Sequence, residues 1–167
     1  MHDWHRDFQR FWILLVLAMI IPFAAHAADD RLALTGLKEV KAAFDIKDGE
    51  GRVLLARLDI IDETRRSLIE QGVTPHFVLA FRGPATRLVQ TDQDKIKPED
   101  REMAAKVAAR IREMSAAPGV EGFEQCAVAA RQQGTKIENV LPQIRVVGNG
   151  FISLAAYQAK GYAYIAP

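Results

Sequence analysis

Apolar residues recur at two different spacings along this chain, and each spacing predicts a different element. Between residues 52 and 71 they follow one another every three or four positions, as they do on one face of a helix. The predicted buried stripe is Leu54, Leu58, Ile61 and Leu68, and most of the charged residues of this segment fall on the opposite side. The glycine that follows is a typical residue just beyond a helix end.

A second helix is predicted to begin at Pro98. Proline suits the first helical position, and the two acids that follow it suit the first turn. Its expected apolar stripe is Met103, Val107, Ile111 and Met114, and the Pro-Gly pair at 118–119 ends it. Residues 85–97, ahead of this helix, have a weaker pattern that favours a partly helical segment and a polar loop.

Short apolar runs bounded by turn residues predict strands between the helices. They cover residues 40–46, 74–81, 120–125, 144–147 and 162–165. Two further helices are expected at 126–133 and 151–160, each followed by a glycine. Strands and helices therefore alternate throughout. This order predicts a single α/β domain with about five mostly parallel strands and helices on both faces of the sheet.

The N-terminal segment has the pattern of a secretory signal. Charged residues at 1–10 precede an apolar run at 11–25, and small residues follow up to Ala27. We predict a signal peptide at 1–27, a lead-in at 28–39, a folded domain at 40–167 and a periplasmic location. The apolar run is short for a membrane span, which needs about 20 residues. A membrane is an expected partner only if the signal stays uncleaved.

Removal of the signal leaves little that could hold a metal or a nucleic acid. Of 22 basic and 21 acidic residues, two of each lie in residues 1–27, so the mature chain carries 20 and 19 and a net charge of +1. This balance gives no reason to expect nucleic acid as a partner. His76 and Cys126 are the only histidine and cysteine left, too few for a usual zinc site. No nucleotide-binding glycine motif occurs, and neither a metal nor a cofactor is expected.

The carboxyl ends of parallel strands share one edge of a sheet, where ligand sites of such folds gather. Four predicted turns reach that edge and supply the candidate residues Asp48, Arg82, Cys126 and Asn149. We expect Asp48, Arg82 and Asn149 to contribute to substrate binding, although a turn, capping or surface role is open for each. His76 begins its strand, so it should lie at the opposite edge, away from Cys126.

Cys126 is the candidate nucleophile. It stands where a strand passes into a helix, and the free N–H groups of a helix start stabilise a thiolate. Arg82 or Arg131 could add positive charge there, and Glu124 would oppose it. An equal alternative is that Cys126 is an inert buried residue, because free cysteines often pack as small apolar groups.

Several segments resemble one known family. CAVAARQQG, LPQIRVV, NGFISLAAYQAKGYAYIAP and AFDIKDGEG are similar to segments of the DsrE/DsrF-like proteins, a sulfur-relay group that includes TusD. The resemblance spans most of the predicted domain. It implies a five-stranded parallel α/β layer and a homotrimer or hexamer. It also implies that Cys126 accepts a sulfur atom as a persulfide and passes it to a partner thiol.

The resemblance makes a periplasmic sulfur carrier or sulfurtransferase the first functional hypothesis. Its partners would be sulfur donor and acceptor proteins, or small sulfur compounds such as thiosulfate and polysulfide. The signal peptide departs from the better-understood members, which work in the cytoplasm, and so leaves these partners open. The alternative is a non-enzymatic, oligomeric binding or assembly module in which Cys126 is structural. A redox sensor that oxidises Cys126 is a third hypothesis.

Overall fold

The computed structural model describes residues 29–167, so the predicted signal peptide lies outside the described residues. The chain divides into two units, Met1–Ala33 and Leu34–Pro167. In the first unit, Arg31 pairs with Asp29 at 2.6 Å (Nη2 to Oδ2). The second unit begins with the rest of the predicted lead-in, which forms turns and reaches the first strand at Glu39.

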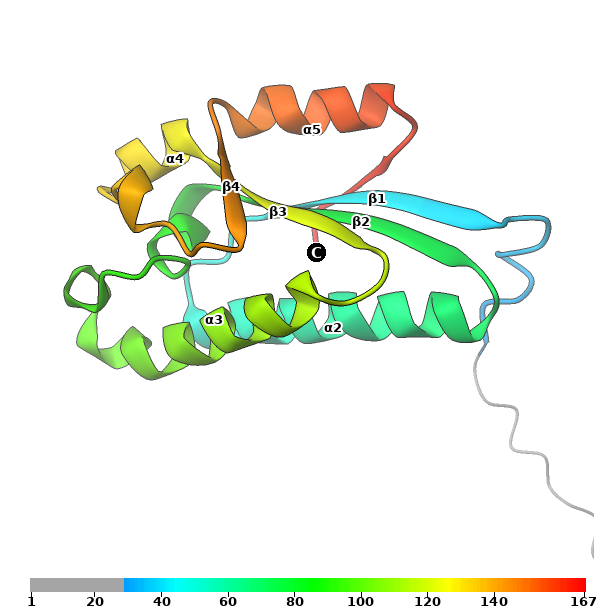
Figure 1. Cartoon of the computed structure of the whole chain (residues 1–167), viewed down its shortest axis with the longest axis horizontal. Helices are drawn as coiled ribbons and strands as arrows, with labels where there is room; N and C mark the ends of the chain where they lie inside the picture. Colours follow the sequence, from blue (N-terminus) through cyan, green and yellow to red (C-terminus); the bar gives the residue numbers. More distant parts are fainter. Residues whose placement is uncertain (1–28) are drawn as a thin grey trace, which may run out of the picture. The chain divides into compact units, whose positions relative to one another are not determined.

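Five parallel strands form one sheet in the order β4-β3-β2-β1-β5 (Figure 1). Every pairing between neighbouring strands is parallel. Each strand lies within one residue of its predicted bounds, and the fold prediction is confirmed. The strands are β1 (Glu39–Ile46), β2 (Thr74–Phe81), β3 (Val120–Cys126), β4 (Ile144–Val147) and β5 (Ala163–Ile165).

Helices cover both faces of the sheet, as predicted. Helices α2 (Gly51–Glu70) and α3 (Arg101–Ser115) lie side by side on one face, and α5 (Gly150–Ala159) lies on the other (Figure 1). The short α4 (Ala127–Gln132) continues directly from β3. Three short 3₁₀ turns, at 83–87, 93–95 and 98–100, connect β2 to α3. A partly helical segment and a polar loop were expected at 85–97. The helix expected to begin at Pro98 begins at Arg101, because Pro98 opens a 3₁₀ turn.

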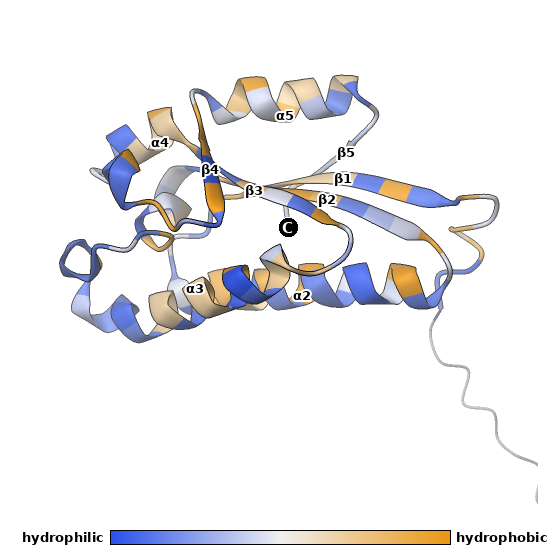
Figure 2. Ribbon diagram, viewed as in Figure 1, coloured by the Kyte–Doolittle hydropathy of each residue, from blue (hydrophilic) through white to orange (hydrophobic). Residues whose placement is uncertain are grey.

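The larger core lies between the sheet and the pair α2 and α3. Leu54, Leu58, Ile61 and Leu68, the predicted stripe, are all buried there. They pack in one cluster with aromatic residues of the strands, among which the rings of Phe81 and Phe123 stack with centroids 6.1 Å apart. The α5 face has a much smaller buried cluster of Ala43, Ala80 and Leu154. Figure 2 shows α5 as mainly apolar, although much of its surface is exposed.

Asp62 and Arg65 depart from the predicted pattern of α2, because both are buried instead of facing solvent. Arg65 donates to Asp62 at 2.7 Å (Nε to Oδ1) and to the carbonyl oxygen of Pro118 at 3.0 Å. Arg110 of α3 donates to the other oxygen of Asp62 at 3.0 Å. These charged groups lie in the contact between α2 and α3. A pattern within one helix carries no information about such a neighbour.

Two residues of α2 give a matched test of this core. Leu58 is 0% exposed and Ile60 is 53% exposed. Leu58→Ala removes buried methyl groups and leaves a cavity, so it should lower the free energy of unfolding by about 2–5 kcal/mol. Ile60→Ala should change it by less than about 1 kcal/mol. Urea unfolding followed by circular dichroism measures both, and equal losses would contradict the assigned faces.

Candidate functional site

The carboxyl ends of the strands bring five groups together at one edge of the sheet. They come from all five strands or from the residues just after them: Asp45, Arg82, Cys126, Gly150 and Tyr164. Three of them are almost fully buried, with exposed fractions of 2% for Asp45, 8% for Arg82 and 4% for Cys126. Burial of charged and nucleophilic groups at this edge makes it the candidate site.

Asp45 and Arg82 form a two-pronged ion pair. The Nε and Nη2 atoms of Arg82 donate to the two carboxylate oxygens of Asp45 at 2.7 and 2.5 Å. The hydroxyl of Tyr164 donates to Asp45 Oδ2 at 2.7 Å, and Lys47 lies 3.7 Å from the same oxygen. This fork geometry is specific to arginine with a carboxylate. The pair ties the ends of β1, β2 and β5 together.

Opposing effects set the pKa of Asp45. Burial alone would raise it, but the hydrogen bonds from Arg82 and Tyr164 outweigh burial and lower the pKa below its usual value. The same contacts act on the partners. The hydrogen bond to Asp45 raises the pKa of Arg82, and the hydrogen bond to Asp45 also raises that of Tyr164. Asp45 is therefore charged at neutral pH and fixes the position of the guanidinium.

Cys126 is the last residue of β3 and the N-terminal cap of α4. Its Sγ accepts a hydrogen bond from the backbone N–H of Ala129 at 3.4 Å. The thiol thus has a donor from the start of α4, and the Arg82 guanidinium beside it is already paired with Asp45.

Gly150 packs directly against Cys126 and Arg82. A Cβ atom added at Gly150 would lie 2.5 Å from Cδ of Arg82 and 3.0 Å from Cβ of Cys126. The next residue, Phe151, places its ring 3.9 Å from Cζ of Arg82, in a cation–π contact. Only a residue without a side chain fits where α5 begins, and this close approach helps to bury the thiol.

The structure brings some of the predicted site residues together and separates others. Arg82 lies beside Cys126, but two of its nitrogens are already taken by Asp45. Asn149 caps α5, accepting the N–H of Phe151 at 2.9 Å. The carboxylate of Asp48 lies 3.8 Å from Nε of Arg57 on α2 and makes no described contact with the other three.

His76 lies at the start of β2, at the opposite edge from Cys126 as predicted. Its Nδ1 is 2.8 Å from Glu121, and its Nε2 is 3.5 Å from Glu39. The described contacts of this histidine are therefore with carboxylates. It cannot serve as a base for the thiol of the same chain.

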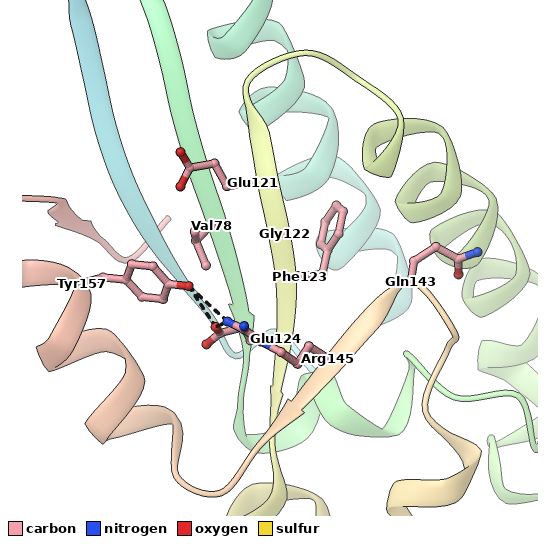
Figure 3. Close-up of a pocket in the computed structure, with 8 residues that line it drawn as sticks. All are labelled: Val78, Glu121, Gly122, Phe123, Glu124, Gln143, Arg145 and Tyr157. Atoms are coloured by element: carbon pink, nitrogen blue, oxygen red, sulfur yellow. Dashed lines mark hydrogen bonds and ion pairs between the residues drawn. The ribbon is translucent and has the colours of Figure 1, made fainter. Parts of the chain in front are cut away.

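Sequence reasoning missed two buried acids, Asp45 and Glu124. Both stand near the end of a strand that is otherwise apolar or buried, and a charge in such a run is a signal that it has a partner. Glu124 is 2% exposed. It accepts hydrogen bonds from Arg145 of β4 and from Tyr157 of α5, the latter at 3.0 Å (Figure 3). Ser153 of α5 also donates to it. Its charge, expected to oppose the positive charge near Cys126, is matched by Arg145.

This second cluster is polar and partly open. Burial is the main cause of the raised pKa of Tyr157, and the negative charge of Glu124 adds to it. The hydrogen bond to Glu124 raises the pKa of Arg145. A hollow of about 380 Å³ adjoins the three side chains, which point toward one another from β3, β4 and α5 (Figure 3).

Comparison with known proteins supports the fold and indicates no activity. No protein-family model matches the chain. An uncharacterised protein of Aquifex aeolicus (strain VF5) is 26% identical over 126 residues, which are 75% of this chain and 55% of that protein. The chain thus spans about half the length of this relative. A solved structure of a protein of unknown function from Methanobacterium thermoautotrophicum is similar, with a TM-score of 0.55 and 19% identity. The match covers 77% of this chain and 98% of that one and shows a common fold.

The side chains of residues 29–167 form no group of three or more histidines, cysteines or acids arranged to hold a metal ion. None of the helices in this part of the chain combines the length and apolar character needed to cross a membrane.

Gly150→Ala tests the close packing over Cys126. The added methyl group has no room beside Arg82 and Cys126, so the free energy of unfolding should fall by about 1–3 kcal/mol. Gly148→Ala is the matched control, because a Cβ atom there meets nothing within 4 Å. Denaturant unfolding of both variants measures the difference. If Gly150→Ala were as stable as the control, α5 would not be seated on these two residues.

Asp45→Asn tests the buried ion pair through its pH dependence. Removing one partner of a buried pair should cost about 3–5 kcal/mol at pH 7. Because the folded-state pKa of Asp45 is lowered, this stabilisation is complete above the unfolded pKa of about 3.9 and is lost as pH falls through the folded value. The difference in free energy of unfolding between the native protein and Asp45→Asn should therefore become smaller below about pH 4.

Asp48→Asn provides the control for this experiment, since the Asp48 carboxylate makes only a 3.8 Å contact and is partly exposed. It should lower the free energy of unfolding by less than about 1 kcal/mol. Unfolding at several pH values between 3 and 7 measures the two variants. If the difference in free energy of unfolding between Asp45→Asn and the native protein did not change with pH, the lowered pKa of Asp45 would be contradicted.

Proposed function

We propose that the protein is a periplasmic sulfur carrier that holds sulfane sulfur as a persulfide on Cys126. The observation that carries this proposal is the position of the thiol. It ends β3 and caps α4, accepts the N–H of Ala129, and adjoins the fixed guanidinium of Arg82. The thiolate is the nucleophilic form of cysteine. The resemblance to the sulfur-relay proteins supports the same role.

The proposed reaction is a pair of displacements at sulfur. With thiosulfate as donor, the Cys126 thiolate attacks the outer sulfur, the S–S bond of thiosulfate breaks, and sulfite leaves with the bonding electron pair. The product is a persulfide on Cys126. An acceptor thiolate then attacks the outer sulfur of the persulfide and takes it, which restores the Cys126 thiolate. Two electron pairs move in turn, and no separate oxidant or reductant is required.

Sulfur transfer requires that the donor and the acceptor can reach the thiol of Cys126. Cys126 is only 4% exposed, and Gly150 packs against it. Loading therefore requires the first turn of α5 to move away from Cys126 and Arg82. The N–H of Phe151 is held there by Asn149, so Asn149 would influence loading by positioning the helix start. This is a different role from the substrate contact expected from the sequence.

The burial of Cys126 also favours a second candidate, a non-enzymatic binding or assembly module. In that case the thiol packs as a small apolar group. The exposed apolar residues at the start of α5, Phe151 at 68% and Ile152 at 69%, would then contact partners. The trimer or hexamer implied by the family resemblance is part of both candidates.

Cys126→Ser separates the candidates. We expect the native protein to gain one or more sulfur atoms, each of about 32 Da, after brief exposure to polysulfide or thiosulfate. The gain should be reversed by reductant and absent from the serine variant, because serine cannot hold a persulfide. Intact-mass spectrometry measures it. A serine hydroxyl can still accept the N–H of Ala129, so the variant should remain folded.

The rate of alkylation by iodoacetamide, with and without denaturant, completes this test. A thiol that labels in the native protein and gains sulfur supports the carrier. A thiol that gains no sulfur and labels only after unfolding overturns the carrier and supports the binding module. Arg131, the other arginine expected to add positive charge near Cys126, is exposed on α4.

A further inference from the structure

A groove between α5 and β4 lies on the same face of the sheet as Glu124 and apart from the buried thiol. It encloses about 390 Å³. Arg145, Asn149, Tyr157 and Lys160 supply polar groups to it, and Val147 and Ile152 supply an apolar wall. The hollow of Figure 3 adjoins it and shares Glu124, Arg145 and Tyr157. We call this the α5–β4 groove.

Hydrogen-bond donors dominate the polar side of the α5–β4 groove. Arg145 uses only Nη2 in its described hydrogen bonds, to Glu124 and Tyr157, and its side chain is 68% exposed. Lys160 makes no ion pair within the described residues, and its Nζ lies 5.6 Å from the ring centre of Tyr157. Asn149 uses its oxygen to cap α5, which leaves its amide nitrogen as a donor.

The carboxylate of the groove is already used. Glu124 receives three donors, from Arg145, Ser153 and Tyr157, and its charge is balanced by Arg145. Lys160 then gives the groove a net positive charge. Glu124 and Tyr157 hold only Nη2 of Arg145. The Nε and Nη1 atoms of this exposed guanidinium are left as donors toward an oxyanion.

We propose that the α5–β4 groove binds a small oxyanion group, held by the free edge of Arg145 and by Lys160, which lie on either side of Tyr157. The apolar wall of Val147 and Ile152 would contact any carbon portion of the ligand. Sulfate-like and carboxylate ligands share the required chemistry. The inference goes beyond the proposed sulfur carrier, because it requires neither Cys126 nor sulfur transfer.

The test is a titration of ¹⁵N-labelled Cys126→Ser protein with sodium sulfate, thiosulfate or acetate, at an ionic strength held constant with sodium chloride. Two-dimensional NMR follows the backbone signals of Arg145, Asn149, Tyr157 and Lys160. We expect saturable shifts that fit one dissociation constant for at least one of the three anions. Saturation by sulfate and thiosulfate alone would identify a tetrahedral oxyanion, and saturation by acetate a carboxylate.

Lys160→Gln should weaken binding by about tenfold, the factor expected for one lost charge-assisted hydrogen bond. This residue has no contact with Glu124 among the described interactions, so the fold should be unaffected. Arg145→Lys keeps a positive charge beside Glu124 but loses the fork, and should also weaken binding. Lys106→Gln is the matched control. It makes the same charge change on α3, on the opposite face, and should leave binding unchanged.

Three results would overturn the inference: shifts that do not saturate, shifts reproduced by chloride alone, or equal weakening by Lys160→Gln and Lys106→Gln. The result is independent of the sulfur carrier. Saturable anion binding without any mass gain on the native protein would support the oxyanion site and contradict the sulfur carrier. A mass gain on Cys126 without saturable anion binding would support the sulfur carrier and contradict the oxyanion site.

Discussion

The buried pair of Asp45 and Arg82 is the constraint on which the edge of the sheet depends. Its charges are nearly out of water, so each is tolerated only while the other stays in place. The pair joins β1 to the end of β2, and Tyr164 adds β5. The start of α5 then packs on Arg82 through Gly150 and Phe151. The enclosure of Cys126 is thus a secondary effect of an ion pair that does not include it.

Much of the fold could be predicted because its signals are local. The stripes of α2 and α3 and the apolar runs of the strands follow from spacing within one element. Strict alternation of strands and helices then leaves few possible topologies. The carboxyl-edge position of Cys126 and Arg82 followed from parallel strands alone, and the structure places both there.

The remainder depends on partners that are distant in the sequence. Asp45 meets residues 37 and 119 positions away, and Glu124 meets residues 21 to 33 positions away. Spacing within a strand could indicate that these acids need partners, but not which ones. Asp48 was chosen because it lies in a turn, yet its carboxylate faces Arg57 of α2. Likewise, the close fit of Gly150 depends on side chains from two other strands.

The two outer strands are very short. Four residues of β4 and three of β5 close the sheet on its two sides, and β4 carries a charged arginine that is held by Glu124. Short outer strands offer few unpaired backbone groups to another chain, and the charge on β4 adds to this, so the sheet resists uncontrolled strand pairing and fibril growth. Copies of this protein that associate would therefore meet through side chains, such as those of α5, and not by extending one continuous sheet.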